Sequence, residues 1–171
     1  MGCVSVLYVH ANAIDFCRDF VLWRFLGYFA KKYMIKMIYE EITSHIIGCA
    51  FDVRRKYGKY MLESFYEQVL EIELKSRGLK VERQVHIDIV HKGVVIPNAY
   101  VADMIVEDKI VLELKAIKTM GVSEFRQLMT YLTLMDKRLG LLINFGAADF
   151  SFGDIKNSGI TLDKGLYRII N

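Results

Sequence analysis

The sequence predicts an α/β protein in which a mixed central sheet lies between helices as a three-layer core. Two segments with apolar residues at helical spacing come first, Glu40–Tyr57 and Met61–Arg77, and a third runs from about Ser123 to Met135. Strand-like segments lie between the second and third helices, and Leu139–Phe145 follows as a nearly continuous apolar run. Helices combined with such apolar strands are typical of a sheet that is covered on both faces.

The first two helices each have one apolar face and end at a glycine. Gly58 follows the first helix and Gly78 follows the second, and glycine is favoured just after a helix because it adopts the left-handed conformation readily. The inward residues are Ile42, Ile46, Ile47, Ala50 and Phe51 in the first helix, and Leu62, Phe65, Tyr66, Val69, Leu70 and Leu74 in the second.

Four strands are expected between the second and third helices. Val85, Ile87 and Ile89 alternate as a half-buried strand, which turns at His91–Gly93 and returns as Val94–Ile96 before Pro97. Two further strands, Tyr100–Val106 and Ile110–Ala116, are expected to pair across the turn Glu107–Lys109. Residues 147–164 are rich in glycine, aspartate and asparagine and are expected to form a loop, with Leu166–Ile170 as one more strand.

The pairing of those two strands suggests a metal site. Alternate side chains of a strand share a face, so Glu113 and Lys115 lie together, and Asp103 of the neighbouring strand can lie beside Glu113. Two converging carboxylates suit a hard divalent cation. A solvated surface hairpin with an ion pair would carry the same three residues. The apolar context of both strands favours the metal site, because a buried carboxylate is costly unless it is paired or bound to metal.

Six segments, in this order, resemble the GxxExxY group of the PD-(D/E)XK nuclease superfamily, over about Glu41 to Phe145. They are Leu62–Glu67 at a helix start, Val81–Gln84 at a strand start, Tyr100–Asp103, Val111–Ala116, Gln127–Tyr131 in a helix and Leu139–Phe145 in a last strand. The order of these segments is more specific than the Asp, Glu and Lys alone. The resemblance implies a PD-(D/E)XK nuclease-like core, with the mixed sheet flanked by the Glu63 helix and the Gln127 helix.

The resemblance also implies roles for individual residues. Asp103 and Glu113 resemble the metal-binding carboxylates, and Lys115 resembles the catalytic lysine. Glu63 resembles the acidic residue of the first core helix that often completes the metal shell; from the sequence alone it is equally a first-turn acid favoured by the helix dipole. Gln127 and Tyr131, four residues apart on one helical face, resemble a pair that holds substrate near the metal, although ordinary packing explains the same spacing.

The chain departs from the group's pattern at four positions. Tyr60 stands where the naming glycine is expected, Lys59 where a proline is common, Ala102 before the aspartate in place of proline, and Arg54 where histidine is frequent. These changes leave the metal-binding residues intact. They affect the segment that enters the Glu63 helix, and with it any part that this segment plays in substrate binding.

The function expected from this resemblance is a nuclease that depends on Mg²⁺ or Mn²⁺ and hydrolyses phosphodiester bonds of DNA, with RNA as another possible substrate. The alternative is a non-catalytic module of the same fold that binds nucleic acid or assembles with proteins; a metal-dependent enzyme acting on another phosphate ester is a third reading. The net charge of +3 permits a polyanionic partner without requiring one. The sequence does not separate single from double strands or endonuclease from exonuclease action.

Three parts of the chain are expected: an apolar helical extension (1–38), the nuclease-like domain (39–146) and a C-terminal loop with a short terminal element (147–171). Charged residues interrupt the apolar stretch Phe20–Phe29, so no membrane span is expected. That extension is expected to pack on the domain or on a partner, as in a homo-oligomer; alternatively, natural translation starts at Met34 or Met37. The three cysteines form no CxxC motif, which suits free thiols in the cytoplasm.

Overall fold

A computed structural model of the chain describes residues 39–153 and 162–171. The chain divides into two compact units, Met1–Ile42 and Thr43–Asn171, and the second holds every strand described below. The predicted N-terminal extension, with Cys3 and Cys17, lies outside the described residues, and so does part of the predicted loop (154–161). Within the described residues, no helix has the length and apolar character needed to cross a membrane.

Three of the predicted helices are present. They are α2 (Glu40–Tyr57), α3 (Glu63–Ser76) and α4 (Val122–Leu134). Gly58 and Gly78 have φ of 74° and 81°, the left-handed conformation expected after α2 and α3. The start of α4 differs slightly from the prediction, because Gly121 rather than Ser123 caps the helix, and the Gly121 N–H donates to Glu124 Oε2 at 2.7 Å.

The sheet has six strands in the order β1-β2-β3-β4-β6-β5. The strands are β1 (Val81–His91), β2 (Val94–Val106), β3 (Ile110–Lys115), β4 (Leu139–Asn144), β5 (Asp149–Phe152) and β6 (Lys164–Ile170). Neighbouring strands are antiparallel except for the pairs β3·β4 and β5·β6, which are parallel. The predicted mixed sheet is therefore confirmed.

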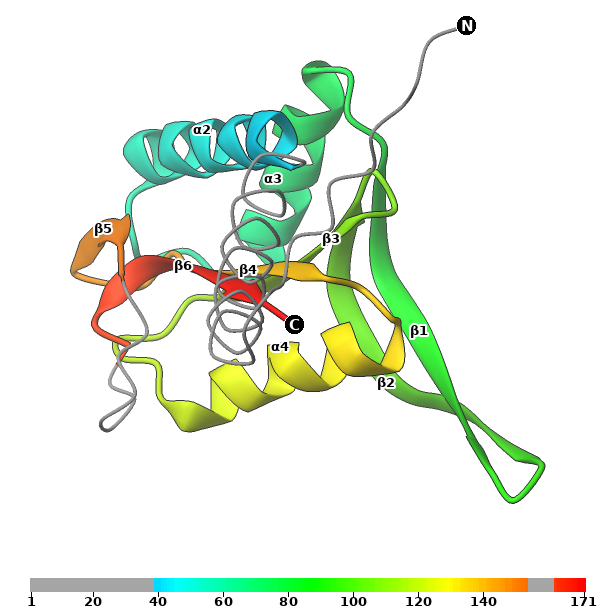
Figure 1. The fold of residues 1–171 in the computed structure, drawn as a ribbon. Coiled ribbons are helices and arrows are strands. Elements are labelled where there is room, and N and C mark those ends of the chain that lie inside the picture. Colours follow the sequence, from blue (N-terminus) through cyan, green and yellow to red (C-terminus); the bar gives the residue numbers. More distant parts are fainter. Residues whose placement is uncertain (1–38, 154–161) are drawn as a thin grey trace, which may run out of the picture. The chain divides into compact units, whose positions relative to one another are not determined.

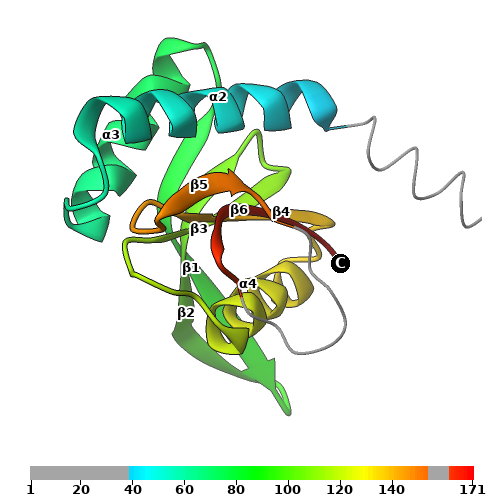
Figure 2. The same ribbon diagram turned by 90° about the vertical axis from the view of Figure 1, so that its left-hand side faces the viewer.

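Helices cover both faces of this sheet (Figures 1 and 2). The helix α3 packs on β1 and β3, and α2 lies on the same side, whereas α4 packs on β3 and β4 from the other side. Residues of α4 and of the sheet share an apolar cluster, which includes Ile87, Ala102, Val111, Leu128, Tyr131, Leu132, Leu142 and Tyr167. This arrangement confirms the predicted three-layer α/β core.

Two predicted strands are in fact one. The chain runs continuously through Pro97 as β2, because its pairing with β1 contains an irregularity at this point. The Asn98 N–H donates to the side chain of Asp88 (Oδ1, 2.8 Å) instead of to a ladder carbonyl, and Asn98 has a φ of 54°. Bulges of this kind accept a proline, which has no N–H to donate.

The predicted loop after β4 contains a short strand that sequence reasoning missed. The residues Asp149–Phe152 form β5 and pair with β6 at the edge of the sheet. Phe150 anchors this strand, since its ring contacts Phe51 edge-on (5.3 Å between centroids) and lies nearly parallel to Phe145 (5.5 Å). The glycines and aspartates of the segment hid these aromatic anchors from pattern analysis.

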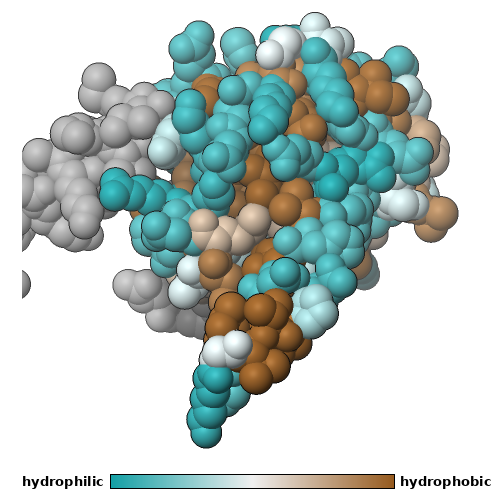
Figure 3. Space-filling view, turned by 90° about the vertical axis from the view of Figure 1, so that its right-hand side faces the viewer, coloured by the Kyte–Doolittle hydropathy of each residue, from teal (hydrophilic) through white to brown (hydrophobic). Residues whose placement is uncertain are grey.

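The β1–β2 ribbon extends beyond the rest of the sheet (Figure 1). Pairing with β3 reaches only Met104–Val106, so the first part of β2 has β1 as its single neighbour. We call residues 89–100 the hairpin arm. Its apolar side chains are exposed, as the brown area above the hydrophilic tip in Figure 3 shows; they are Val90, Val94, Val95, Ile96 and Tyr100.

Candidate active site

The strand β3 places a carboxylate in the centre of the sheet. Its neighbours are β2 and β4, and its residues from Ile110 to Leu114 are all buried. Glu113 is 0% exposed, and Lys115, two residues on, donates from Nζ to Glu113 Oε1 at 2.6 Å. The second oxygen, Glu113 Oε2, is buried and has no hydrogen-bond partner. A buried polar atom without a partner is uncommon and calls for a functional explanation.

Asp103 joins this pair from β2, as predicted. The antiparallel pairing of β2 with β3 runs from Val106–Ile110 to Met104–Leu112. The next amide, Leu114 N–H, donates instead to the Asp103 side chain, at 2.7 Å from Oδ2. The Asp103 carboxylate therefore takes the place of a backbone acceptor beside the central strand.

Both carboxylates lose their protons less readily than they would in water, because their pKa values are raised. Burial raises the pKa of Asp103 to about 6, although the Leu114 N–H and the charge of Lys115 oppose this shift. Burial also raises the pKa of Glu113 to about 7, and the neighbouring charge of Asp103 adds to the shift. The positive charge of Lys115 therefore does not fully offset the cost of burying both carboxylates.

For Lys115, the neighbouring negative charges outweigh the effect of burial and favour the charged form. Burial disfavours its charged form, but the hydrogen bond and charge of Glu113, with smaller contributions from Glu63 and Asp103, raise the pKa of Lys115 above its usual value. The side chain is thus an ammonium group at neutral pH. It is suited to stabilise negative charge on a phosphate rather than to remove a proton from water.

Glu63 stands at the first position of α3 and is half-buried. Its charge contributes to the raised pKa of Asp103, Glu113 and Lys115, so it lies within electrostatic reach of all three. Glu63 forms no ion pair within the described residues. The next acid on this face, Glu67, is instead committed to Arg83 (Nε, 2.9 Å) and Gln84 (Nε2, 2.8 Å).

Gln127 and Tyr131 lie on α4 and contact each other, as their spacing predicts. The Gln127 side-chain amide donates to the Tyr131 hydroxyl at 2.7 Å. Tyr131 is buried, which raises its pKa, and the charges of Glu113 and Asp103 raise it further. The helix α4 thus places the Tyr131 hydroxyl close enough to Asp103 and Glu113 for their charges to affect it.

The donor set fits a divalent cation bound through two carboxylates. Asp103 and Glu113 are hard oxygen donors, and the unpartnered Glu113 Oε2 has a lone pair available. Within residues 39–153 and 162–171, no three His, Cys, Asp or Glu side chains are close enough together to form a complete cage. Magnesium does not need one, because it commonly binds through one or two carboxylates and completes its shell with water and substrate phosphate.

Comparison with known families agrees with this geometry. The family model described as the PD-(D/E)XK nuclease superfamily matches residues 40–156, which is more than half of the chain. The chain belongs to the PD-(D/E)XK nuclease superfamily. Members generally hydrolyse phosphodiester bonds, so a nuclease-like function and a nucleic-acid substrate are indicated. Neither the search of curated proteins nor that of solved structures gave a match.

Sequence reasoning missed two residues of β4 and its exit that shape this PD-(D/E)XK site. Asn144, which is fully buried and pairs with Lys115 in the β3·β4 register, binds both backbone groups of Ile117 (N–H at 3.0 Å and C=O at 2.8 Å). Gly146 also donates to Asn144 Oδ1, and a Cβ at Gly146 would lie 2.5 Å from the Ile117 oxygen. Together they fix the chain that leaves Lys115. An asparagine at the end of an apolar strand was the available signal.

Proposed function

We propose that the protein is a nuclease of the GxxExxY group that hydrolyses phosphodiester bonds of DNA with the help of Mg²⁺ or Mn²⁺. The observation that carries the proposal is the pair of carboxylates formed by the fully buried Glu113 and the half-buried Asp103, beside the ammonium group of Lys115. In this proposal residues 39–146 form the nuclease domain, and residues 1–38 and 147–171 are additions to it.

Asp103 and Glu113 would hold the metal ion, and Glu63 would complete its shell. When bound, such an ion polarises the phosphate and lowers the pKa of a coordinated water. Lys115 can act next to it without competing for the same atom, since it occupies Glu113 Oε1 and leaves Oε2 free. Its ammonium group then stabilises the charge that develops on the phosphate oxygens.

Gln127 and Tyr131 would position the substrate from the other side of the sheet. The Gln127 amide holds the Tyr131 hydroxyl in a defined place at 2.7 Å, so that one of these polar groups can donate to a phosphate oxygen. The assignment to the GxxExxY group is supported by Tyr66, which follows Glu63 by three residues. The Tyr66 hydroxyl donates to the Gly58 carbonyl at 2.7 Å and so ties down the segment that leads into Glu63.

A metal titration tests the proposed site directly. Mn²⁺ should raise the melting temperature of the wild-type protein by mass action, and Asp103→Asn/Glu113→Gln should remove this response. The matched control is Glu82→Gln/Asp136→Asn, which neutralises two exposed acids away from the site and should respond as wild type does. Equal shifts in all three proteins would remove the metal-site proposal.

A substrate panel tests the activity. Linear, circular and single-stranded DNA, together with RNA, should be incubated with wild type and with Asp103→Asn/Glu113→Gln in Mg²⁺ and in Mn²⁺. Cleavage by wild type alone supports the proposal. Binding of nucleic acid without cleavage under either metal would instead identify the protein as a non-catalytic module on the same fold.

A further inference from the structure

The segment that joins α2 to α3 exposes a row of large apolar side chains next to the site. Tyr60 is 86% exposed, Leu62 76% and Met61 42%. Single exposed apolar residues are ordinary, but three in succession form a local apolar surface. We call Lys59–Leu62 the Tyr60 loop. Its position before Glu63 puts this surface at the edge of the catalytic centre.

The fold holds the Tyr60 loop in place. The Tyr66 hydroxyl donates to the Gly58 carbonyl at 2.7 Å and accepts from the Met61 N–H at 3.3 Å. Tyr66 itself is buried and stacks on Phe145, with 4.3 Å between ring centroids and 6° between planes. The backbone on both sides of Tyr60 is therefore fixed to the core, while the Tyr60 side chain points into solvent.

The short stretch of chain between Tyr60 and Glu63 limits how far Tyr60 can lie from the proposed metal site. Glu63 lies three positions after Tyr60, so their Cα atoms are at most about 11 Å apart. Stacked nucleotides rise about 3.4 Å each along one strand. With the lengths of the Tyr60 and Glu63 side chains added to this Cα separation, a base that contacts Tyr60 would lie within a few nucleotides of the phosphate at the metal site.

A second exposed segment lies near the Tyr60 loop. Both views place the turn between α2 and α3 close to the segment that leaves β3 (Figures 1 and 2). That segment exposes Ile117 and Lys118, and the Asn144 side chain fixes its backbone. Apolar and basic side chains thus occur on two segments that border an acidic centre.

Unpaired cations accompany these apolar residues. Lys56, Lys59 and Lys118 form no salt bridge with the acids of the described residues. Lys59 lies over the Tyr60 ring, with Nζ at 5.4 Å from the centroid, and Lys56 lies similarly over Tyr57 at 5.2 Å. Exposed aromatic rings combined with free cations are the usual elements of a surface that binds single-stranded nucleic acid.

Resting on the proposed nuclease function, we infer that the Tyr60 loop is a binding site for unpaired nucleotides. A base stacks on the open face of Tyr60, and the flanking phosphates meet Lys59 and Lys118. In a duplex the faces of the bases are covered by their neighbours, so this contact requires a single-stranded segment or a frayed end. The substrate class is therefore nucleic acid with unpaired nucleotides within a few positions of the scissile phosphate.

Binding measurements in a Lys115→Ala background, with Ca²⁺ present, test this inference without cleavage. The probes are a labelled thymidine oligonucleotide and a blunt duplex. Tyr60→Ala should weaken oligonucleotide binding about tenfold or more, as loss of base–aromatic stacking does, and Tyr60→Phe should retain it. Duplex binding should change by less than about twofold, and Ile72→Ala, which truncates an exposed residue near the middle of α3, should leave both probes unaffected.

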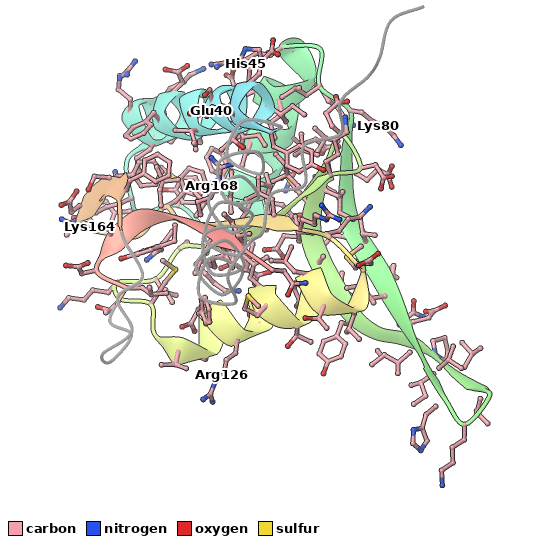
Figure 4. All side chains as sticks on the ribbon, in the orientation of Figure 1. Glu40, His45, Lys80, Arg126, Lys164 and Arg168 are labelled. Carbon is pink, nitrogen blue, oxygen red and sulfur yellow. The ribbon has the colours of Figure 1, made fainter. Side chains whose placement is uncertain are left out.

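Salt dependence gives a second readout. Lys59→Ala should reduce the slope of log affinity against log salt by about 0.7, the value for one phosphate contact on a single strand. The matched control is Arg126→Ala, since Arg126 projects from α4 away from the sheet (Figure 4). Unchanged oligonucleotide binding in Tyr60→Ala, or an equal loss for oligonucleotide and duplex, would overturn the inference. If wild type cuts nothing while Tyr60 still governs binding, the stacking site stands and the nuclease proposal fails.

Discussion

The carboxylate site and the hairpin arm both depart from the usual pattern in which apolar side chains are buried and charged ones are exposed, and they do so in opposite ways. The site buries charged groups, with Glu113 completely enclosed, whereas the arm leaves Val90 and Val94 each 66% exposed. The single strand β2 contributes to both regions. Its last three residues pair with β3 and directly follow Asp103, while its first half has β1 as its single neighbour and carries Val94–Ile96.

Burying a carboxylate and exposing a valine differ in their cost in free energy. Burial of a carboxylate opposes its ionisation, which is why the pKa of Asp103 rises to about 6 and that of Glu113 to about 7. An exposed valine merely fails to gain the energy of burial. Groups with such perturbed pKa values gather at functional sites, so the buried charges are the stronger indication of chemistry.

The largest effect is expected on DNA cleavage when Lys115, the cation beside the two carboxylates, is replaced. Lys115→Ala should lower DNA cleavage by about 10²- to 10³-fold, the range expected for loss of one group that stabilises charge in the transition state. The exposed Lys109 provides the matched control, and Lys109→Ala should cleave as wild type does. Initial rates at saturating Mn²⁺ would measure both. If the two variants cleave alike, Lys115 balances charge in the sheet without serving the reaction.

The next effect concerns stability against pH in metal-free protein. Because the pKa of Glu113 is raised from 4.5 to about 7, the folded state binds its proton more tightly than the unfolded state does. Stability should therefore fall as pH rises from about 5 to 8, by an amount on the order of 3 kcal/mol for this group. Glu113→Gln should flatten the dependence.

Urea unfolding in EDTA across this pH range would measure that effect. The control is Glu82→Gln, which alters an exposed acid and should keep the wild-type slope. Added Mg²⁺ should offset the loss of stability at pH 8, because a cation compensates the buried charges. A Glu113→Gln protein with the wild-type pH dependence would show that this carboxylate is not the source of the cost.

The pattern of apolar residues predicted most of the core. The α2 boundaries, the inward residues Tyr66, Leu70 and Leu74 of α3 and the pairing of β2 with β3 follow from helical spacing, glycine positions and strand runs. The inward position predicted for Leu62 is wrong, because this residue precedes α3 and is 76% exposed. In α2 the buried residues are Thr43, Ile46, Cys49, Ala50 and Val53, of which only Ile46 and Ala50 were predicted.

Asp103, Glu113 and Lys115 were identifiable because they interrupt apolar strand runs. Their convergence depends on a register that the short turn Glu107–Lys109 determines.

Contacts between distant segments were not predictable. The strand β5 exists because Phe150 packs on Phe51 and Phe145, and its four residues alone, among glycines and aspartates, were too short to predict a strand. The continuity of β2 through Pro97 depends on the Asp88 side chain of the opposite strand. Asn144 acquires its role because β4 lies parallel to β3, a pairing fixed by the whole sheet.

A smaller effect is expected at Tyr66, which links the core to the entrance of the site. Tyr66→Phe removes the hydroxyl that holds Gly58 and Met61 but keeps the ring on Phe145. Unfolding free energy should fall by about 1 kcal/mol, the usual contribution of a hydrogen bond. Tyr57→Phe, at a half-buried tyrosine for which the structure gives no hydroxyl hydrogen bond, serves as the control. Equal stability of the two variants in urea unfolding would contradict the anchoring role.

The smallest effect is expected in the hairpin arm, where the comparison is sharpest. Val95→Thr replaces a 55% exposed valine by a polar residue of the same shape and equally good strand propensity. It should change the unfolding free energy by less than about 0.5 kcal/mol and leave cleavage unchanged. The matched substitution Val111→Thr, in the fully buried part of β3, should cost about 1–3 kcal/mol, because its hydroxyl would have to be desolvated. A comparable loss in both variants would mean that Val95 is covered in solution, and sedimentation analysis of the wild-type protein would then show whether a second copy covers the arm.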